Sequence, residues 1–324
     1  RDQLEDSIRT AAGIDSGKKI NYVSMSKYSN VTVKHSTVTG KDKIAVLFAE
    51  GSIVMGEGDD TNIGGNRYAE ELRKLRLDST VKAIVFRVNS RGGNAIASDQ
   101  IWREVELTDK VKPVVVSMGN YAASGGYYIA AAGRKIIASP VTITGSIGVF
   151  GLIPNAQTLL DKKLGISSDV VRTNAHSDSP SLTRPLSAFE KDALQDNVER
   201  TYNTFTGVVA AGREMSQPAV DSIGQGHVWS GADAIPIGLV DSFGGLRDAI
   251  SEAATLAGLE EYRTIEKPES ADLYTKLLKE LAGGIRAKAI RQELGEVSRY
   301  YFDLKDIISS GGIQAAMPYY LEIR

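Results

Sequence analysis

Ser124 lies between two apolar runs, and two glycines follow it directly in the sequence ASGG. A serine at the start of a helix has backbone N–H groups beside it, and the helix dipole favours negative charge there. The oxyanion formed when a hydroxyl attacks a carbonyl needs such donors, and glycines let a substrate backbone approach closely. These residue types and their spacing favour a serine nucleophile, and a buried strand that feeds a buried helix is the structural alternative.

A second pair of glycines, Gly92 and Gly93, follows the apolar segment VKAIVFRVNS and precedes a segment of helical pattern. Consecutive glycines can form a nest of backbone N–H groups, and α/β folds place active sites at the carboxyl ends of strands. The pair is a candidate second set of oxyanion donors. A tight strand-to-helix turn is the alternative.

The stretch Val114–Gly133 contains no charged residue, which raises the question of a membrane span. A spanning helix needs about 20 predominantly apolar residues. This stretch has the length, but polar residues and glycines fill its centre: Ser117, Gly119, Asn120, Ser124, Gly125 and Gly126. The pattern therefore predicts a β-branched strand followed by a helix inside a folded domain.

The elements around these turns alternate between strand and helix patterns. Apolar β-branched runs begin near Lys43, Val81, Val114 and Arg134, and helical patterns separate them. Such alternation predicts an α/β fold with parallel strands. We divide the chain into an N-terminal tail or end of a preceding domain (1–40), a catalytic domain (41–260) and a helical C-terminal extension (261–324). Within the catalytic domain, Ser187 and Glu190 form a predicted capping box for a long helix.

Composition limits the classes of function. The chain has 324 residues, 42% of them hydrophobic, and a formal net charge of −2, which gives no electrostatic basis for binding nucleic acid. It has no cysteine, and its three histidines lie far apart in the sequence, so no metal site is predicted. No cofactor is predicted either.

Four segments together resemble the signal peptide peptidase A (protease IV) family. They are VFRVNSRGGNAIASDQI, KPVVVSMGNYAASGGYYIA, SPVTITGSIGVFG and GHVWSGADAIPIGLVDSFGGLRDAI, which occur in this order between about residues 43 and 258. The resemblance implies a ClpP/crotonase-like fold with repeated strand-turn-helix units. It also implies a serine peptidase that uses a Ser–Lys dyad.

The resemblance assigns roles to four residues. It implies that Ser124 is the nucleophile and that the backbone N–H groups of Gly93 and Gly125 form the oxyanion hole. Ser146, in TGSIGV, matches a serine that hydrogen-bonds the catalytic lysine. The family motif has proline where this chain has Arg91, an exchange expected to loosen the turn and keep the glycines.

The general base is missing from the position that the resemblance implies. Single-length members carry the lysine in a segment similar to VVRTNAHSDSPSLTRPLS, where this chain has Ser177. In double-length members the serine comes from the C-terminal half and the lysine from the N-terminal half. We therefore expect that this chain is such a C-terminal half, with the base supplied from outside it. His176 lies in the same segment and is the candidate substitute base.

The expected function is hydrolysis of short hydrophobic peptides, such as cleaved signal peptides, by a ring-like homo-oligomer. The resemblance implies a bacterial inner-membrane protein whose catalytic domain is on the periplasmic side, with the N-terminal half of the parent protein as a partner. The isolated chain is expected to show little or no activity. Two rival functions stay open: a crotonase-like acyl-CoA enzyme and a non-catalytic half of a larger assembly.

Overall fold

The computed structural model describes residues 2–15, 18–24, 27, 41–268, 292–293, 295 and 312–316. The chain divides into two compact units, Arg1–Thr39 and Gly40–Arg324. In the first unit, α1 (Asp2–Ala12) is an α-helix. The second unit contains every candidate residue of the active site.

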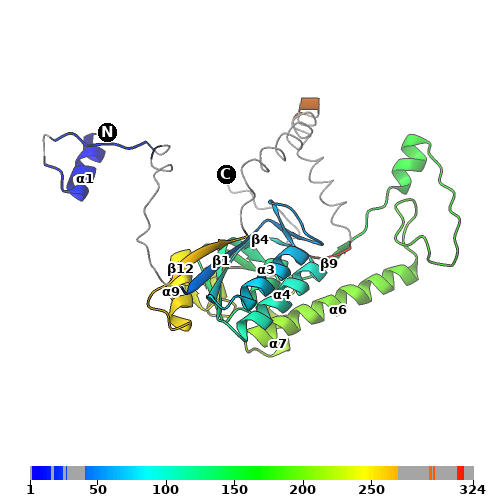
Figure 1. The fold of residues 1–324 in the computed structure, drawn as a ribbon. Helices are drawn as coiled ribbons and strands as arrows, with labels where there is room; N and C mark the ends of the chain where they lie inside the picture. The colour runs from blue at the N-terminus through cyan, green and yellow to red at the C-terminus, as the bar shows by residue number, and fades with distance from the viewer. Residues whose placement is uncertain are drawn as a thin grey trace. The chain divides into compact units, whose positions relative to one another are not determined.

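The main sheet of the second unit has the strand order β10-β8-β6-β4-β1-β12, and β7 and β11 extend it beside β6 (Figure 1). The pairs are parallel except for β10 with β8. The strands are β1 (Lys43–Glu50), β4 (Val81–Ser90), β6 (Val114–Ala123), β7 (Lys135–Ala138), β8 (Ile143–Gly145), β10 (Val228–Ser230), β11 (Ser242–Phe243) and β12 (Arg263–Lys267).

Helices cover both faces of this sheet, which explains why its central strands are almost continuously apolar. Alternate residues enter two separate hydrophobic clusters: Val115 packs with α9, whereas Val114 and Val116 pack on the opposite face with α3, α4, α5 and α6. The helices are α3 (Gly65–Leu77), α4 (Ala95–Asp109), α5 (Gly125–Ala130), α6 (Ala188–Gly212), α7 (Gln217–Ile223), α8 (Gly231–Ala234) and α9 (Leu246–Leu256).

A second, smaller sheet has the order β3-β2-β5-β13-β9. Its strands are β2 (Ser52–Val54), β3 (Asn62–Gly64), β5 (Gly92–Asn94), β9 (Phe150–Leu152) and β13 (Gly312–Ala316). β13 comes from the C-terminal region and is antiparallel to both of its neighbours, β5 and β9. This sheet brings the Gly92–Gly93 turn next to a segment more than 200 residues away in the sequence.

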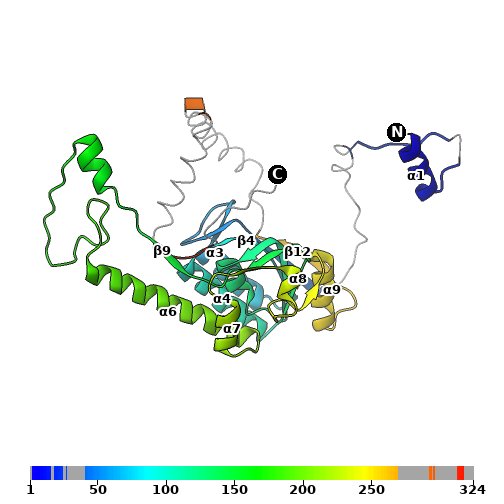
Figure 2. The same cartoon turned by 180° about the vertical axis from the view of Figure 1, so that it is seen from behind.

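A segment of residues 153–187 joins β9 to α6 and projects from the sheets, drawn in green in Figures 1 and 2. It contains a short π-helix, η1 (Leu159–Leu164). None of its residues is buried. This segment is hereafter called the projecting segment.

The structure confirms the α/β class. The predicted β-branched strand and the helix after it are β6, which extends to Ala123, and α5, which begins at Gly125. In the region 261–324, expected to be helical, the described segments β12 and β13 are strands, while most of that region lies outside the described residues. The predicted capping box of Ser187 and Glu190 is present at the start of α6.

Candidate active site

Ser124 occupies the turn between β6 and α5 in a strained backbone conformation. Its φ is 54° and its ψ is −119°, a region that L-residues rarely adopt. Backbone bonds hold the turn: Ser124 N donates to Gly145 O at 2.8 Å, and Tyr128 N donates to Ser124 O at 2.8 Å. A serine on a sharp strand-to-helix turn is also the arrangement that presents the nucleophile in α/β-hydrolases.

The hydroxyl of Ser124 is buried and faces the loop after β8. Its Oγ donates to Gly148 O at 3.3 Å. Ser146 lies in the same loop, is buried, and has a φ of 47°; its backbone N donates to His227 O at 2.7 Å. A carbonyl oxygen cannot take up the serine proton at neutral pH, so this contact orients the hydroxyl without activating it.

The two glycine turns approach each other closely. A methyl group placed on Gly92, whose φ is 95°, would lie 2.6 Å from Gly125 N and 2.2 Å from Ala315 O. A methyl group on Gly125 would lie 2.9 Å from the same Ala315 oxygen. Only glycine therefore allows the two turns and this carbonyl to meet.

β13 supplies that carbonyl. The strand lies between β5 and β9, with Ala315 opposite Gly93 and Gly312 opposite Leu152. Ala315 is fully buried. A peptide carbonyl of the chain itself thus lies against the turns in which oxyanion donors were predicted at Gly93 and Gly125, beside Ser124. β13 was not predicted from the sequence, in which Ile313, Ala315 and Ala316 are the local signal for a strand.

Within this chain His176 lies far from Ser124, the nucleophile for which it is the candidate substitute base. Its ring stacks on Phe189 with centroids 4.6 Å apart, and its Nδ1 is 3.6 Å from Glu190 Oε1. Glu190 lies in the first turn of α6, whereas Phe205 in the same helix packs on Tyr128 beside the nucleophile turn. Fifteen residues of helix between Glu190 and Phe205 span about 22 Å.

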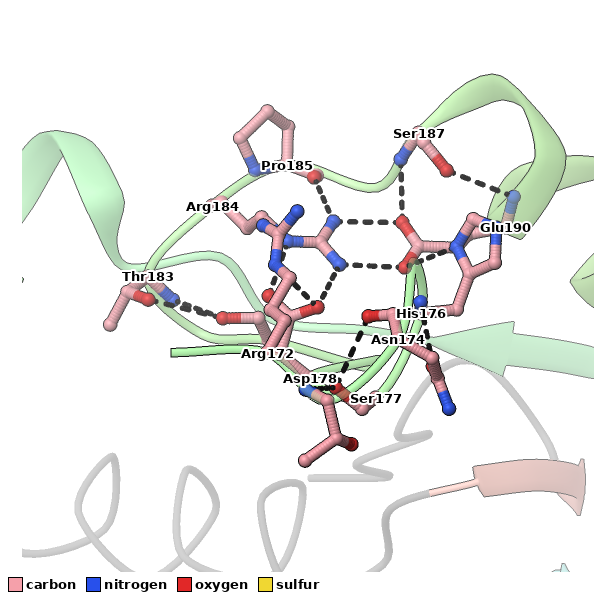
Figure 3. A network of polar contacts seen from close by, with 12 residues as sticks. Arg172, Asn174, His176, Ser177, Asp178, Thr183, Arg184, Pro185, Ser187 and Glu190 are labelled. Atoms are coloured by element: carbon pink, nitrogen blue, oxygen red, sulfur yellow. Dashed lines mark hydrogen bonds and ion pairs between the residues drawn. The ribbon is translucent and has the colours of Figure 1, made fainter. Parts of the chain in front are cut away.

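An ion-pair network holds the projecting segment at the start of α6 (Figure 3). The guanidinium of Arg184 donates to Asp178 Oδ1 at 2.9 Å and Oδ2 at 2.8 Å, and to Glu190 Oε1 at 2.7 Å and Oε2 at 2.8 Å. Arg172 also contacts Asp178 at 3.1 Å. Hydrogen bonds from Arg184 lower the pKa of Asp178 to about 2 and hold the pKa of Glu190 far below its usual range.

Ser177, which matches the family's lysine position, lies in this same network. Its Oγ donates to Asn174 O at 3.3 Å and accepts from Thr173 N at 3.2 Å (Figure 3). A side chain at this position is as remote from Ser124 as His176 is. Any residue that acts there as a base must therefore serve the serine of another folded unit.

Other titratable residues near the sheet have structural partners. His227 packs on Trp229 with ring centroids 4.3 Å apart, and Asp241 accepts from Ile136 N at 2.6 Å and pairs with Arg213. Lys135 pairs with Glu252 at 2.8 Å. These contacts give the three side chains structural roles in packing, in a turn and at the surface.

A pocket of about 400 Å³ opens next to Ser146 and Gly148. α6 provides Glu199 and Tyr202 on its other side. Because Gly148 O is the partner of Ser124 Oγ, a side chain that enters this pocket from another unit would approach the nucleophile. Among the described residues, we find neither a group of three or more metal-binding side chains nor a helix long and apolar enough to cross a membrane.

Family models match two stretches of the chain. The model of peptidase family S49 matches residues 106–260, and that of Clp protease matches residues 35–166. The second match agrees with the ClpP-like fold expected from the sequence. Among solved structures, a ClpP1 mutant from Listeria monocytogenes aligns with 66% of this chain and 96% of its own at 17% identity, with a TM-score of 0.43.

Curated relatives include Protease 4 of Salmonella typhi, which is 41% identical over 268 residues, or 82% of this chain. The Arabidopsis thaliana protein "Serine protease SPPA, chloroplastic" is 34% identical over 87% of this chain. This chain spans only 43% and 42% of their lengths. The "Putative signal peptide peptidase SppA" of Enterococcus faecium is 32% identical over 82% of this chain and 77% of its own length. The chain is therefore a member of peptidase family S49, the signal peptide peptidase A (protease IV) family.

Proposed function

We propose that this chain is a serine peptidase domain that hydrolyses short hydrophobic peptides, with Ser124 as the nucleophile and the N–H groups of Gly93 and Gly125 as oxyanion donors. The observation that carries the proposal is the carbonyl of Ala315, which lies against both glycine turns next to Ser124. β13 acts as an intramolecular stand-in for an extended peptide. A substrate would add to β5 and β9 as a strand in the same way.

In the reaction, Ser124 Oγ attacks the carbonyl carbon of the peptide bond while a base takes the hydroxyl proton. The tetrahedral oxyanion then receives hydrogen bonds from the two glycine N–H groups. When this intermediate collapses, the amine leaves with a proton and an acyl-enzyme forms, which water hydrolyses. The strained turn at Ser124 holds the nucleophile in place before the substrate arrives.

The base is a lysine from a second folded unit, and the pocket beside Ser146 is where it enters. A lysine accepts a proton only when burial or a nearby cation keeps it neutral. Ser146 borders the pocket and can orient the amine. The partner unit is a homologous domain, the N-terminal half of a longer parent protein, and the assembly is a ring-like oligomer. Exposed apolar residues on the projecting segment support such contacts: Leu159, Leu164, Ile166 and Val171.

Exposed apolar side chains beside the strands of the small sheet support the proposal that the substrates are hydrophobic peptides. Met55 follows β2, Ile96 follows β5 and Leu152 ends β9, and all three side chains are exposed. Such a rim favours apolar extended peptides, the class that includes cleaved signal peptides. The proposed location is the periplasmic side of a bacterial inner membrane, where such peptides are released.

The test is hydrolysis of a fluorogenic apolar peptide by the full-length parent protein and by its Ser124→Ala variant. We expect the variant to lose at least about 10⁴-fold in rate at an unchanged melting temperature, as removal of a nucleophile does. A fluorophosphonate should label the parent protein at Ser124. Thioester hydrolysis that survives Ser124→Ala would favour the crotonase-like rival, and absence of both activities and of labelling would favour a non-catalytic half.

A further inference from the structure

Ser90 ends β4, two residues before Gly92, and its hydroxyl is engaged on both sides. The side chain is buried, its Oγ donates to Gly51 O at 2.7 Å, and the same Oγ accepts from Gly92 N at 3.1 Å. A hydroxyl that donates one hydrogen bond and accepts another has a fixed orientation. The proposed reaction assigns no step to this serine, so its buried polar contacts beside the site need a separate explanation.

The bond from Gly92 decides which amide of the glycine turn can serve a substrate. Because the N–H of Gly92 is bound to Ser90, the amide of Gly93 is the one of the two that is left as an oxyanion donor. This amide belongs to the peptide group between two glycines, which by themselves restrict its rotation little. β2 limits Gly93 from one side, since a methyl group there would lie 2.1 Å from Ile53 O. The bond to Ser90 fixes the same peptide group at Gly92.

Ser90 also contacts the nucleophile turn. The register between β4 and β6 shifts before Ser90, which lies opposite Ala122, two residues before Ser124. A methyl group on Gly126 would lie 2.6 Å from Ser90 O and 3.3 Å from Ser90 Cβ. This one residue therefore lies against both glycine turns that provide the proposed oxyanion donors, and it can set the position of one turn relative to the other.

We propose that Ser90 is a positioning residue for the oxyanion hole. Its hydroxyl holds the peptide group between Gly92 and Gly93 so that the N–H of Gly93 points at the developing oxyanion. This inference rests on the proposed function and extends it beyond the two donors. A donor that is oriented before the reaction stabilises the transition state more than it stabilises the bound substrate. Loss of the hydroxyl should therefore lower kcat and leave KM nearly unchanged.

The test compares the full-length parent protein with its Ser90→Ala and Ser90→Cys variants, with rates expressed per folded molecule. The thiol of cysteine fills the space of the hydroxyl but forms only weak hydrogen bonds, so Ser90→Cys removes the contacts without leaving a cavity. For a fluorogenic apolar peptide we expect kcat to fall roughly 10- to 100-fold in Ser90→Ala and several-fold in Ser90→Cys. KM should stay within about threefold of its original value.

A peptide boronic acid provides a readout that a purely structural role would not change. Ser124 Oγ bonds to the boron, the hydroxyl proton passes to the base, and one oxygen of the resulting tetrahedral boronate takes the place of the oxyanion. In Ser90→Ala the inhibition constant should rise by about the factor by which kcat/KM falls. The dissociation constant of the matching peptide amide, which has no boron, should stay within about threefold.

Ser117→Ala is the matched control. Ser117 is also a buried serine whose Oγ accepts an N–H, in this case from Arg87 at 2.9 Å. It lies two residues after Val115 in β6 and therefore on the same face of the sheet, the face covered by α9. Ser117→Ala should keep kcat and the boronate affinity within about twofold.

Unchanged kcat and boronate affinity in folded Ser90→Ala, or equal losses in Ser117→Ala, would overturn the role of Ser90 and leave the proposed peptidase intact. Equal weakening of the boronate and of the peptide amide would also overturn it, because Ser90 would then act on substrate binding. If Ser90→Ala does not fold, Ser90→Cys decides by the same criteria. Absence of serine-dependent hydrolysis in the unsubstituted parent protein would overturn this inference together with the proposed function.

Discussion

The nucleophile turn and the projecting segment are stabilised by different forces. The turn at Ser124 is fully buried and is fixed by backbone hydrogen bonds and by glycine contacts too close for any side chain. The projecting segment has no buried residue and is held by Arg184 and its two carboxylates. The first region is therefore held by close packing, whereas the second depends on charge. The stability of the projecting segment should therefore depend on pH, whereas that of the nucleophile turn should not depend on these ion pairs.

The sharpest test of this contrast compares two glycines. A methyl group on Gly93 would lie 2.1 Å from Ile53 O, whereas one on Gly165, in the projecting segment, meets nothing within 4 Å. We expect Gly93→Ala to lower the free energy of unfolding by roughly 2–4 kcal/mol. It should also lower turnover of the folded fraction by about 10²–10³-fold.

Gly165→Ala should lower the free energy of unfolding by only about 1 kcal/mol, the cost of placing alanine in a left-handed backbone conformation. For both variants of the parent protein, denaturant unfolding measures the change in stability, and turnover per folded molecule measures the change in activity. Equal effects at the two glycines would contradict the contrast. Normal turnover in folded Gly93→Ala would reduce that turn to a structural role.

A second prediction concerns the remote position of Ser177. Placing a lysine there cannot activate Ser124 in the same unit, because α6 separates them by about 20 Å. We expect Ser177→Lys in the isolated chain to raise peptide hydrolysis at least about tenfold, with a rate per molecule that increases with protein concentration. Rates should also rise with pH as the lysine loses its proton. Rescue that is independent of concentration would show that the segment reaches its own serine.

A third prediction addresses the charge dependence of the projecting segment. Asp178 has a pKa lowered to about 2 by Arg184, so its stabilisation is complete above its ordinary pKa near 4. The stabilisation is lost as the pH falls from about 4 towards 2. Hydrogen exchange of residues 153–187, corrected for intrinsic rates, should show loss of protection over this interval while β4 and β6 stay protected.

The variant Arg184→Met should remove this protection at all pH values, whereas Arg103→Met on α4 should not. Protection in the segment that is unchanged by Arg184→Met would show that something other than the ion pairs holds it. Simultaneous loss of protection in β4 and β6 would show that the two regions unfold together.

The smallest expected effect belongs to His176. Because its ring packs on Phe189 far from Ser124, His176→Gln should change turnover of the parent protein by less than about twofold. The pH–rate profile should keep its shape, since the imidazole takes no proton from the nucleophile. A loss of several orders of magnitude would restore His176 as a base, acting on another unit.

Local signals in the sequence predicted the parts of the site that depend on local geometry. The ASGG turn and the Gly92–Gly93 turn follow from glycine placement and from β-branched strands, and both lie where the alternation of elements places them. β13 could not be paired from sequence, because its partner β5 is distant in the chain and its five residues carry no long pattern. His176 and Ser177 were placed by similarity of segment alone, and segment similarity does not show how far a connection projects.

The alternation of residues across the main sheet has a consequence for how the sequence can change over time. Val115 faces one hydrophobic cluster, and its chain neighbours Val114 and Val116 face the other. Substitutions at adjacent positions of β6 therefore meet separate sets of side-chain neighbours. The cluster that contains Tyr127 and Tyr128 also supports the nucleophile turn, whereas the cluster around α9 does not contain these residues. Substitutions in the α9 cluster should therefore lower stability without removing a side chain that packs behind the nucleophile turn.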